Sequence, residues 1–328
     1  MDRATLEALV GQQMGEHGVA GLAVAVVEGS DLIYERAFGV SSEDPAATLA
    51  PDSPFMAGSL TKPVFAYAVL LLCQRGLLDL DTPLAELWPE PFSPDPRLAR
   101  VTARHVLSHS AGFPSWRDGD TLPIETDLGQ AFNYSGEGYE YLQCALEALA
   151  GEPMAATLGA LVLKPRGMAA SQLFWNAYDP PRDVAEMAGQ RLPEQWWDTS
   201  HAAYSLLTTA GDYGRFLLAM LNPAADGLDE ASLARMLSPQ IAVAAAPGLS
   251  WGLGWGLQTL GDEPCFWHWG KIGGREQGYT CYAAGLPGRR RGVVILTNSL
   301  NGLDACEPIA QHVLDLPAAH PALAWVRS

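Results

Sequence analysis

The sequence predicts an α+β fold: strands from the two ends of the chain form one antiparallel sheet flanked by helices, and a large helical domain is inserted between those ends. Strand-like composition is concentrated in residues 21–38 and 251–297, and the part between them is rich in helical periodicity. The chain has 328 residues, of which 48% are hydrophobic, and this is enough to bury a large core.

The first expected elements are a helix and a hairpin. Residues 4–16 have the amphipathic pattern of a surface helix. Two β-rich runs, residues 21–27 and 32–38, flank a Glu-Gly-Ser-Asp turn, which is typical of a β-hairpin.

The inserted part and the rest of the sheet follow. Helices are expected at residues 63–75, 102–108, 138–150, 155–163 and 208–221. Strands are expected at residues 251–260, 265–271, 278–285 and 292–297, and a last helix at 304–316. We therefore expect a sheet domain of residues 1–58 and 240–328, covered by the first and last helices, and a helical domain of residues 59–239. The functional site should lie between the two domains.

Charge and hydropathy narrow the range of partners. A formal net charge of −17 repels nucleic-acid phosphates and anionic lipids. The one basic run, residues 289–291, is flanked by glycines and is interpreted as a solvated hairpin tip. The longest apolar run, residues 64–73, is about half of what a membrane span needs. We expect neither a nucleic-acid nor a membrane partner, and the sequence does not predict an oligomeric state.

The start of the chain and its cysteines predict the compartment. The first residues are polar and helix-like, without the basic and apolar segments of an export signal. The five cysteines are odd in number, scattered, and without a Cys-x-x-Cys pair, which favours a reducing environment. The sequence therefore predicts a cytoplasmic protein, provided that no leader precedes it.

The stretch Ser59-Leu60-Thr61-Lys62 is the first candidate for chemistry. Of the 20 basic residues only three are lysines, so a lysine here is unusual. Pro63 can sit only in the first turn of a helix, which places Ser59 near the helix start and Lys62 one turn away on the same face. A buried lysine, unlike an arginine, can lose its proton and act as a base. The spacing therefore indicates a serine nucleophile activated by lysine.

Further segments follow in a recognisable order: VTARHVLSHSAGFPSW at 101–116, FNYSGEGYEYL at 132–142, YSLLTTAGDYGRFLLAML at 204–221 and FWHWGKIGGREQGYT at 266–280. Together with FMAGSLTKPVF at 55–65, they resemble the serine β-lactamase-like family, which includes class C β-lactamases, D-Ala-D-Ala carboxypeptidases and esterases of the same fold. The resemblance covers nearly the whole chain and implies a β-lactamase/transpeptidase-like fold acting on a small-molecule ester or amide. It implies no metal or organic cofactor.

The resemblance also implies roles for three residues that handle protons. Ser59 corresponds to the nucleophile and Lys62 to the base beside it. Tyr134, in the second motif, would share the general-base role and pass a proton to the leaving group.

A third motif would stabilise the charge that develops on the substrate. His268-Trp269-Gly270 matches the family's His-x-Gly variant, on a strand expected to line the cleft, and Lys271 follows it. The resemblance implies an oxyanion hole made by the backbone N–H groups of Ser59 and Lys271. Two preorganised donors of this kind typically contribute several kcal/mol to the stability of a tetrahedral intermediate.

One position departs from the family pattern. Where the second motif should end in asparagine, this chain has Gly136, which has no side chain to hold a substrate amide. This favours ester cleavage over β-lactam or peptide cleavage. Glu137 or Gln277 could supply a substitute polar group.

Several aromatic residues fall in segments expected to face the cleft. Trp116, Tyr139, Trp196 and Trp269 could form an apolar pocket for short to medium acyl groups, together with the space at Gly136. Packing in the core is the commoner use of such residues, and this alternative stays open.

Two other motifs suggest competing sites. Residues 248–252 spell Gly-x-Ser-x-Gly, which would make Ser250 the nucleophile, but the surrounding sequence lacks the required strand before it and helix after it. His105 and His109 have the spacing of two zinc ligands, but a zinc protease needs glutamate where Val106 stands. We interpret both histidines as structural.

Three hypotheses for the function follow. The first is a cytoplasmic serine hydrolase that cleaves small carboxylic esters through an acyl-enzyme on Ser59. The second is a β-lactamase or D-amino-acid peptidase or amidase that uses the same site. The third is a binding protein without activity, against which the retention of Ser59, Lys62 and Tyr134 together argues.

Overall fold

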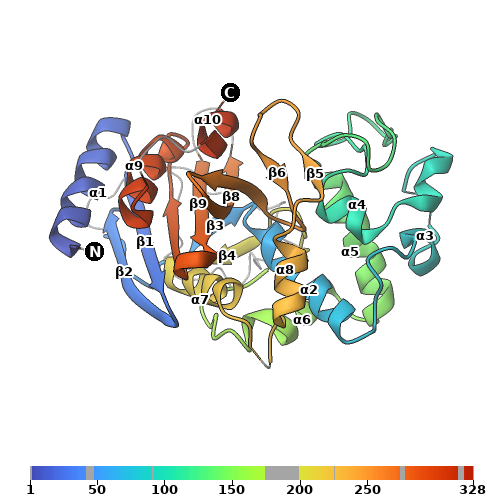
Figure 1. Cartoon of the computed structure of the whole chain (residues 1–328), viewed down its shortest axis with the longest axis horizontal. Helices are drawn as coiled ribbons and strands as arrows, with labels where there is room; N and C mark the ends of the chain where they lie inside the picture. Colours follow the sequence, from blue (N-terminus) through green and yellow to red (C-terminus); the bar gives the residue numbers. More distant parts are fainter. Residues whose placement is uncertain are drawn as a thin grey trace.

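An eight-stranded antiparallel sheet joins the two ends of the chain, as predicted (Figure 1). The structure is a computed structural model that describes residues 2–41, 48–90, 92–173, 199–224, 226–273, 278–316 and 321–327. The strand order is β2-β1-β10-β9-β8-β7-β6-β5. The strands are β1 Gly21–Glu28, β2 Asp31–Gly39, β5 Ile241–Ala242, β6 Ser250–Trp251, β7 Gly256–Leu260, β8 Glu263–Gly273, β9 Gly278–Leu286 and β10 Arg291–Thr297.

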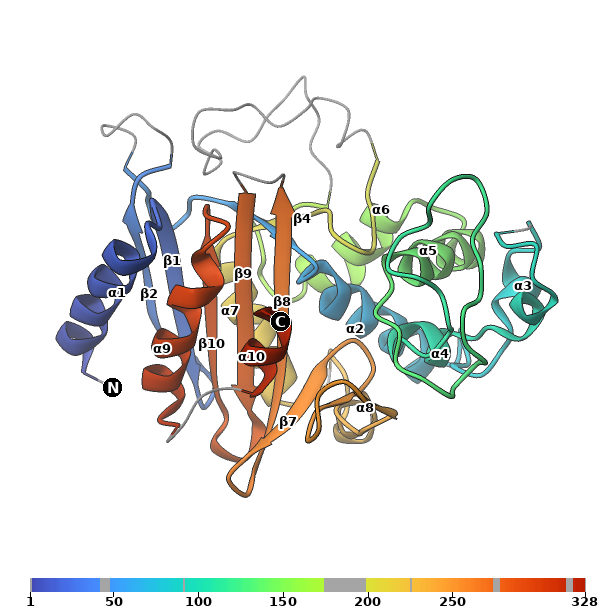
Figure 2. The same ribbon diagram turned by 90° about the horizontal axis from the view of Figure 1, so that it is seen from above.

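The helices divide between the sheet and the inserted part. In Figures 1 and 2 the helices from the middle of the chain, drawn in cyan and green, lie beyond the β8 side of the sheet. The helices are α1 Arg3–His17, α2 Thr61–Gln74, α3 Leu84–Leu87, α4 Ala103–Leu107, α5 Gly136–Ala150, α6 Met154–Leu158, α7 Ala210–Leu221, α8 Glu230–Met236, α9 Gly302–Leu314 and α10 Pro321–Arg327. A second, two-stranded sheet pairs β3 Phe55–Gly58 with β4 Leu206–Thr208.

Both faces of the large sheet are buried, because successive residues of a strand point to opposite faces. On one face Val24 and Val26 of β1 share a core with α1 and α9. On the other face Ala25 and Val27 share the larger core with α7, which packs against β1, β2 and β10. In Figure 2 α9 lies in front of the sheet and α7 behind it. The range expected to form the helical domain thus also supplies one cover of the sheet.

Two predicted elements differ from the structure. Residues 251–260 form two strands rather than one, because a turn at Gly252 to Gly254 separates β6 from β7. Gly254 has φ +88°, and an added Cβ would lie 2.5 Å from the Ala66 Cβ of α2, so only glycine fits there. Residues 155–163 form α6 and then a π-helical turn, Gly159–Leu163.

Within the described ranges no single helix is both long and apolar enough to cross a bilayer, and one pair, residues 136–150 and 154–163, meets the length and composition criteria only together, with a bend of 79° between its members.

Candidate active site

Ser59 lies in a tight turn between β3 and α2. Gly58 before it has φ +53°, and α2 begins two residues after it, at Thr61. The Thr61 hydroxyl donates to the Gly58 carbonyl (2.6 Å) and accepts from the Leu206 N–H of β4 (2.9 Å). These bonds fix the turn on both sides and leave Ser59 partly exposed.

Lys62 is buried next to this serine. Its side chain is 1% exposed, and its Nζ donates to Ser59 Oγ (3.1 Å) and to the Ala203 carbonyl (2.8 Å). Burial lowers the pKa of Lys62 to about 7, while the Glu140 carboxylate acts in the opposite direction and raises it. Near neutral pH a large fraction of the amine is therefore uncharged and able to accept a proton.

Tyr134 lies against the same amine. The Lys62 Nζ is 5.0 Å from the centre of its ring. Burial raises the pKa of the Tyr134 hydroxyl well above its usual range, whereas the Ser59 side chain lowers it. The hydroxyl reaches no partner within hydrogen-bond limits among the described residues, so Ser59 is its neighbour and not a hydrogen-bond partner. Tyr134 is thus protonated in the resting site, and Lys62 is the group able to act as base.

His109 holds the loop that carries Tyr134. Its Nδ1 accepts from the Ser135 N–H (3.0 Å), and its carbonyl accepts from the Asn133 N–H (2.7 Å). Its ring lies 4.3 Å from the Tyr134 ring, between centres. Burial holds the pKa of His109 well below its usual value, so the ring is neutral. His109 therefore has a structural role.

The other members of the alternative motifs also occupy structural positions. His105 takes part in the capping of α4 by Thr102, and the described part of the chain contains no cluster of His, Cys, Asp or Glu suited to a metal ion. Ser250 lies in β6, which continues into a turn and β7. Because no helix follows Ser250, the residue cannot occupy a nucleophile elbow.

Strand β8 presses against the turn that holds Ser59. A Cβ added to Gly270 would lie 1.9 Å from the Ala57 carbonyl oxygen and 3.4 Å from the Ser59 nitrogen. A Cβ added to Gly58 would lie 3.0 Å from the Lys271 nitrogen. Two glycines therefore let the backbones at Ser59 and Lys271 come together, and the Lys271 side chain is exposed.

His268 is fully buried on the same strand. Its Nδ1 lies 2.7 Å from the Trp269 carbonyl, which can only accept, so Nδ1 carries the proton. Its Nε2 has no hydrogen-bond partner among the described residues. Burial, together with the charge of Lys62, lowers the pKa of His268 to about 3. The ring is thus a neutral group with a free lone pair.

The predicted pocket residues divide into several groups. Trp116 is 50% exposed and lies over Gly136. Tyr139, in contrast, is fully buried, with its ring centre 5.4 Å from the Lys62 Nζ, so it packs against the lysine amine and does not line open space. Trp269 is partly buried, and its ring lies 4.9 Å from the Tyr134 ring. Trp196 lies outside the described residues.

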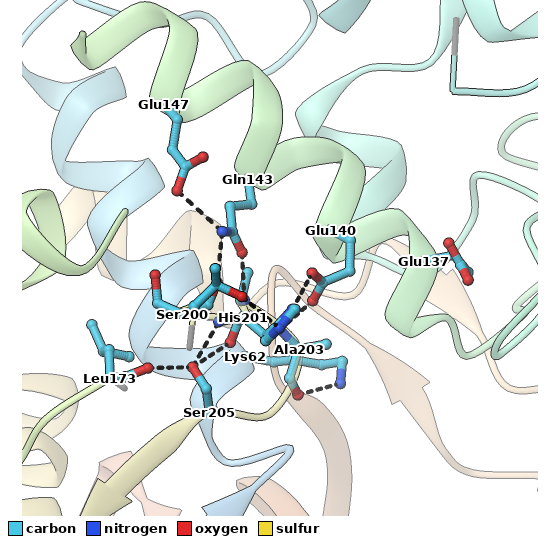
Figure 3. A network of polar contacts seen from close by, with 12 residues as sticks. Lys62, Glu137, Glu140, Gln143, Glu147, Leu173, Ser200, His201, Ala203 and Ser205 are labelled. Carbon is cyan, nitrogen blue, oxygen red and sulfur yellow. Dashed lines mark hydrogen bonds and ion pairs between the residues drawn. The ribbon is translucent and has the colours of Figure 1, made fainter. Parts of the chain in front are cut away.

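The polar substitutes considered for the missing asparagine are not confirmed. The Glu137 carboxylate accepts from Arg117, from both Nη2 (2.6 Å) and the backbone N–H (3.1 Å) of that residue. Glu137 stands apart from the other polar residues in Figure 3. Gln277 lies outside the described residues.

A polar network behind Lys62 was not anticipated (Figure 3). Glu140 of α5 accepts from the Ala203 N–H (3.3 Å) and lies 2.8 Å from His201 Nδ1. Gln143, one turn later, accepts from the Ala202 N–H (2.8 Å). This network fixes the segment whose Ala203 carbonyl receives the Lys62 amine. The helical spacing of Glu140 and Gln143 was visible in the sequence, but a backbone carbonyl leaves no sequence signal.

The fold and these contacts define one structural class of protein. Its features are an antiparallel sheet with a helical insertion, a partly exposed serine, and a buried lysine that is hydrogen-bonded to this serine. Comparison with known proteins agrees. The family model described as Beta-lactamase matches residues 6–315, and the chain belongs to this family, whose members are serine hydrolases.

Two curated relatives and one solved structure illustrate the range of the family. Esterase EstB from Burkholderia gladioli is 30% identical over 196 residues, which span 50% of each chain. Penicillin-binding protein 4 from Amycolatopsis lactamdurans is 29% identical over 316 residues, covering 86% of this chain and 82% of that protein. The octameric penicillin-binding protein homologue from Pyrococcus abyssi shares the fold with a TM-score of 0.80, at 23% identity over 96% of this chain and 77% of that one.

Proposed function

We propose that this protein is a serine hydrolase that cleaves small carboxylic esters through an acyl-enzyme on Ser59. The observation that carries the proposal is the buried Lys62 amine, which has a pKa of about 7 and forms a hydrogen bond of 3.1 Å with Ser59 Oγ. Nucleophile and base in this geometry are what acyl transfer requires.

In the acylation step the neutral Lys62 amine takes the proton of Ser59 as Oγ attacks the ester carbonyl carbon. The carbonyl π electrons move to oxygen, and the backbone N–H groups of Ser59 and Lys271 stabilise that oxyanion, each donor being worth about 3 kcal/mol. When the intermediate collapses, the carbon–oxygen bond to the alcohol breaks, and Tyr134 donates its proton to the leaving oxygen. The Lys62 ammonium returns a proton to Tyr134.

Deacylation follows the same path with water in place of serine. Lys62, again neutral, accepts a proton from the water that attacks the acyl carbon. The bond between the acyl carbon and Ser59 Oγ breaks, Tyr134 donates its proton to Oγ, and the Lys62 ammonium returns a proton to Tyr134. The products are a carboxylic acid and an alcohol, and the site returns to its starting protonation state.

The absence of a side chain at Gly136 supports esters over amides. An amide is a harder substrate because its leaving group is a poorer one, so it gains more from a residue that holds the amide in place. The similarity to an esterase over half of the chain agrees with this preference.

The second candidate is a β-lactamase or a D-amino-acid peptidase or amidase with the same nucleophile. The longer match to a penicillin-binding protein favours it. In either case the partner is a small-molecule ester or amide. The cytoplasmic location and the domain boundaries at residues 59 and 239 remain predictions.

One experiment separates these alternatives. The purified protein and its Ser59→Ala and Ser250→Ala variants are assayed on p-nitrophenyl butyrate and on a chromogenic cephalosporin. We expect ester cleavage that disappears in Ser59→Ala, persists in Ser250→Ala, and exceeds cephalosporin cleavage. Faster cephalosporin cleavage would establish the second candidate, and loss in Ser250→Ala alone would remove Ser59 as the nucleophile.

A further inference from the structure

The Trp116 indole occupies the space above Gly136. A Cβ added to Gly136 would lie 2.4 Å from both Cη2 and Cζ2 of the indole, well inside any permitted contact. Any residue larger than glycine at this position would therefore displace the ring. The missing side chain at Gly136 and the presence of Trp116 are two parts of one arrangement.

The chain on both sides of Trp116 is fastened to the start of α5. The Ser115 carbonyl accepts from the Gly136 N–H (2.9 Å). Arg117 donates from its backbone N–H (3.1 Å) and from Nε (3.0 Å) to Glu137, whose side chain is buried. The residues before and after Trp116 are thus bonded to the two residues beneath it. Because the backbone on both sides of Trp116 is already fixed, binding of a ligand against the indole would cost little further conformational entropy.

Half of the surface of Trp116 is exposed to solvent although the backbone around it is fixed. Trp116 is 50% exposed, although tryptophan is a residue that folding usually buries. Its ring makes an edge contact with Tyr204, at 5.8 Å between centres. The exposed Trp116 ring and the edge of the Tyr204 ring form an apolar wall, and the face of Tyr204 is stacked on His201 at 4.7 Å between ring centres.

The two rings adjoin the segments that carry Tyr134 and Ala203. Gly136 is two residues from Tyr134, and Tyr204 directly follows Ala203, whose carbonyl receives the Lys62 amine. Both rings are therefore attached to the segments that hold Tyr134 and the Lys62 amine.

We propose that Trp116, with the edge of Tyr204, forms a subsite for a flat apolar group of the substrate, and that Gly136 is present to make room for it. The inference rests on the proposed acyl chemistry at Ser59. It adds that the site prefers aromatic or similarly flat groups, on either the acyl or the alcohol side of the ester.

The test uses Trp116→Ala and Trp116→Phe, with Leu77→Ala as a control for the loss of another exposed apolar side chain (58% exposed). The acyl arm compares p-nitrophenyl benzoate with p-nitrophenyl acetate. The alcohol arm compares benzyl acetate with ethyl acetate. In one arm we expect the preference for the aromatic ester, measured as a ratio of kcat/KM values, to fall about tenfold in Trp116→Ala.

The Trp116→Phe variant should retain most of that preference, and the Leu77→Ala control should retain all of it. The arm that responds shows which side of the ester the wall receives. Equal losses on aromatic and small esters would mean that Trp116 only supports the fold, and unchanged ratios in both arms would also refute the proposal.

Boronic acids give a readout that does not depend on ester turnover, because they form tetrahedral adducts with an activated serine. The affinity ratio of phenylboronic to methylboronic acid should fall by a similar factor in Trp116→Ala. A wild-type protein that binds both acids but cleaves no ester would disprove the ester function, and its affinity ratio would still decide the role of Trp116. An unchanged ratio would refute the subsite.

Discussion

The pKa of Lys62 gives the reaction a pH dependence that can be derived from the structure. In the proposed mechanism only the neutral amine can take the proton of Ser59, and burial lowers the Lys62 pKa to about 7 in the free protein. As pH falls below that value the active fraction decreases about tenfold per unit, so kcat/KM two units lower should be about one hundredth of its plateau. Above this range the profile should be flat until another group titrates.

Replacement of Glu140 tests the cause of this value. The Glu140 carboxylate raises the Lys62 pKa, so Glu140→Gln should lower it and move the acid limb of the profile to lower pH. Glutamine keeps a side-chain oxygen for the Ala203 N–H, which preserves that part of the network. Glu125→Gln, at an exposed position, is the matched control and should leave the limb in place.

The assay is kcat/KM for p-nitrophenyl butyrate between about pH 5 and pH 9 for the three proteins. A profile that still rises about tenfold per unit at the alkaline end of this range, as it would for a lysine with the ordinary pKa of 10.5, would refute the argument that burial neutralises Lys62. A limb that moves to higher pH in Glu140→Gln would show that the sign assigned to Glu140 is wrong.

Two further predictions concern the cost of this arrangement. Lys62→Met should abolish activity but raise the free energy of unfolding by a few kcal/mol at pH 7, because folding no longer removes a proton from a lysine whose unfolded pKa is near 10.5. This gain in the free energy of unfolding should disappear as pH rises towards 10.5. Urea unfolding of both proteins at several pH values would measure it, and a gain that does not change with pH would contradict this explanation. Gly270→Ala should lower kcat by at least about a hundredfold, since its Cβ would push β8 off Ala57 and separate the two proposed oxyanion donors. Steady-state kinetics would show this loss, and an unchanged kcat would refute the role proposed for Lys271.

Local patterns in the sequence were enough to predict most of the sheet and the contact between Ser59 and Lys62. Strand β10 consists mostly of buried, β-branched residues, which are typical of a strand. The spacing of Ser59 and Lys62 places these two residues one helical turn apart. Such signals succeed where neighbours in sequence are also neighbours in space.

The parts that were not predicted depend on contacts between distant segments. The Ala203 carbonyl is one of many equivalent backbone groups, and only the folded chain selects it. The burial of Tyr139 and the break in the strand at Gly254 both result from packing against α2 and its surroundings. From the sequence, Gly136 indicated only the loss of a side chain that could hold a substrate amide. In the structure, Trp116 fills the space that this side chain would occupy.

The position of Lys62 also has a consequence for the order of folding. Its carbonyl partner lies 141 residues further along the chain, and the strand that presses on Ser59 comes later still. Closing contacts over such separations is slow, and a chain still being synthesised cannot make them. Until β8 docks, Lys62 lacks the burial that holds its amine neutral. In a partly folded chain Ser59 should therefore be unreactive, and small esters in its surroundings should not acylate it.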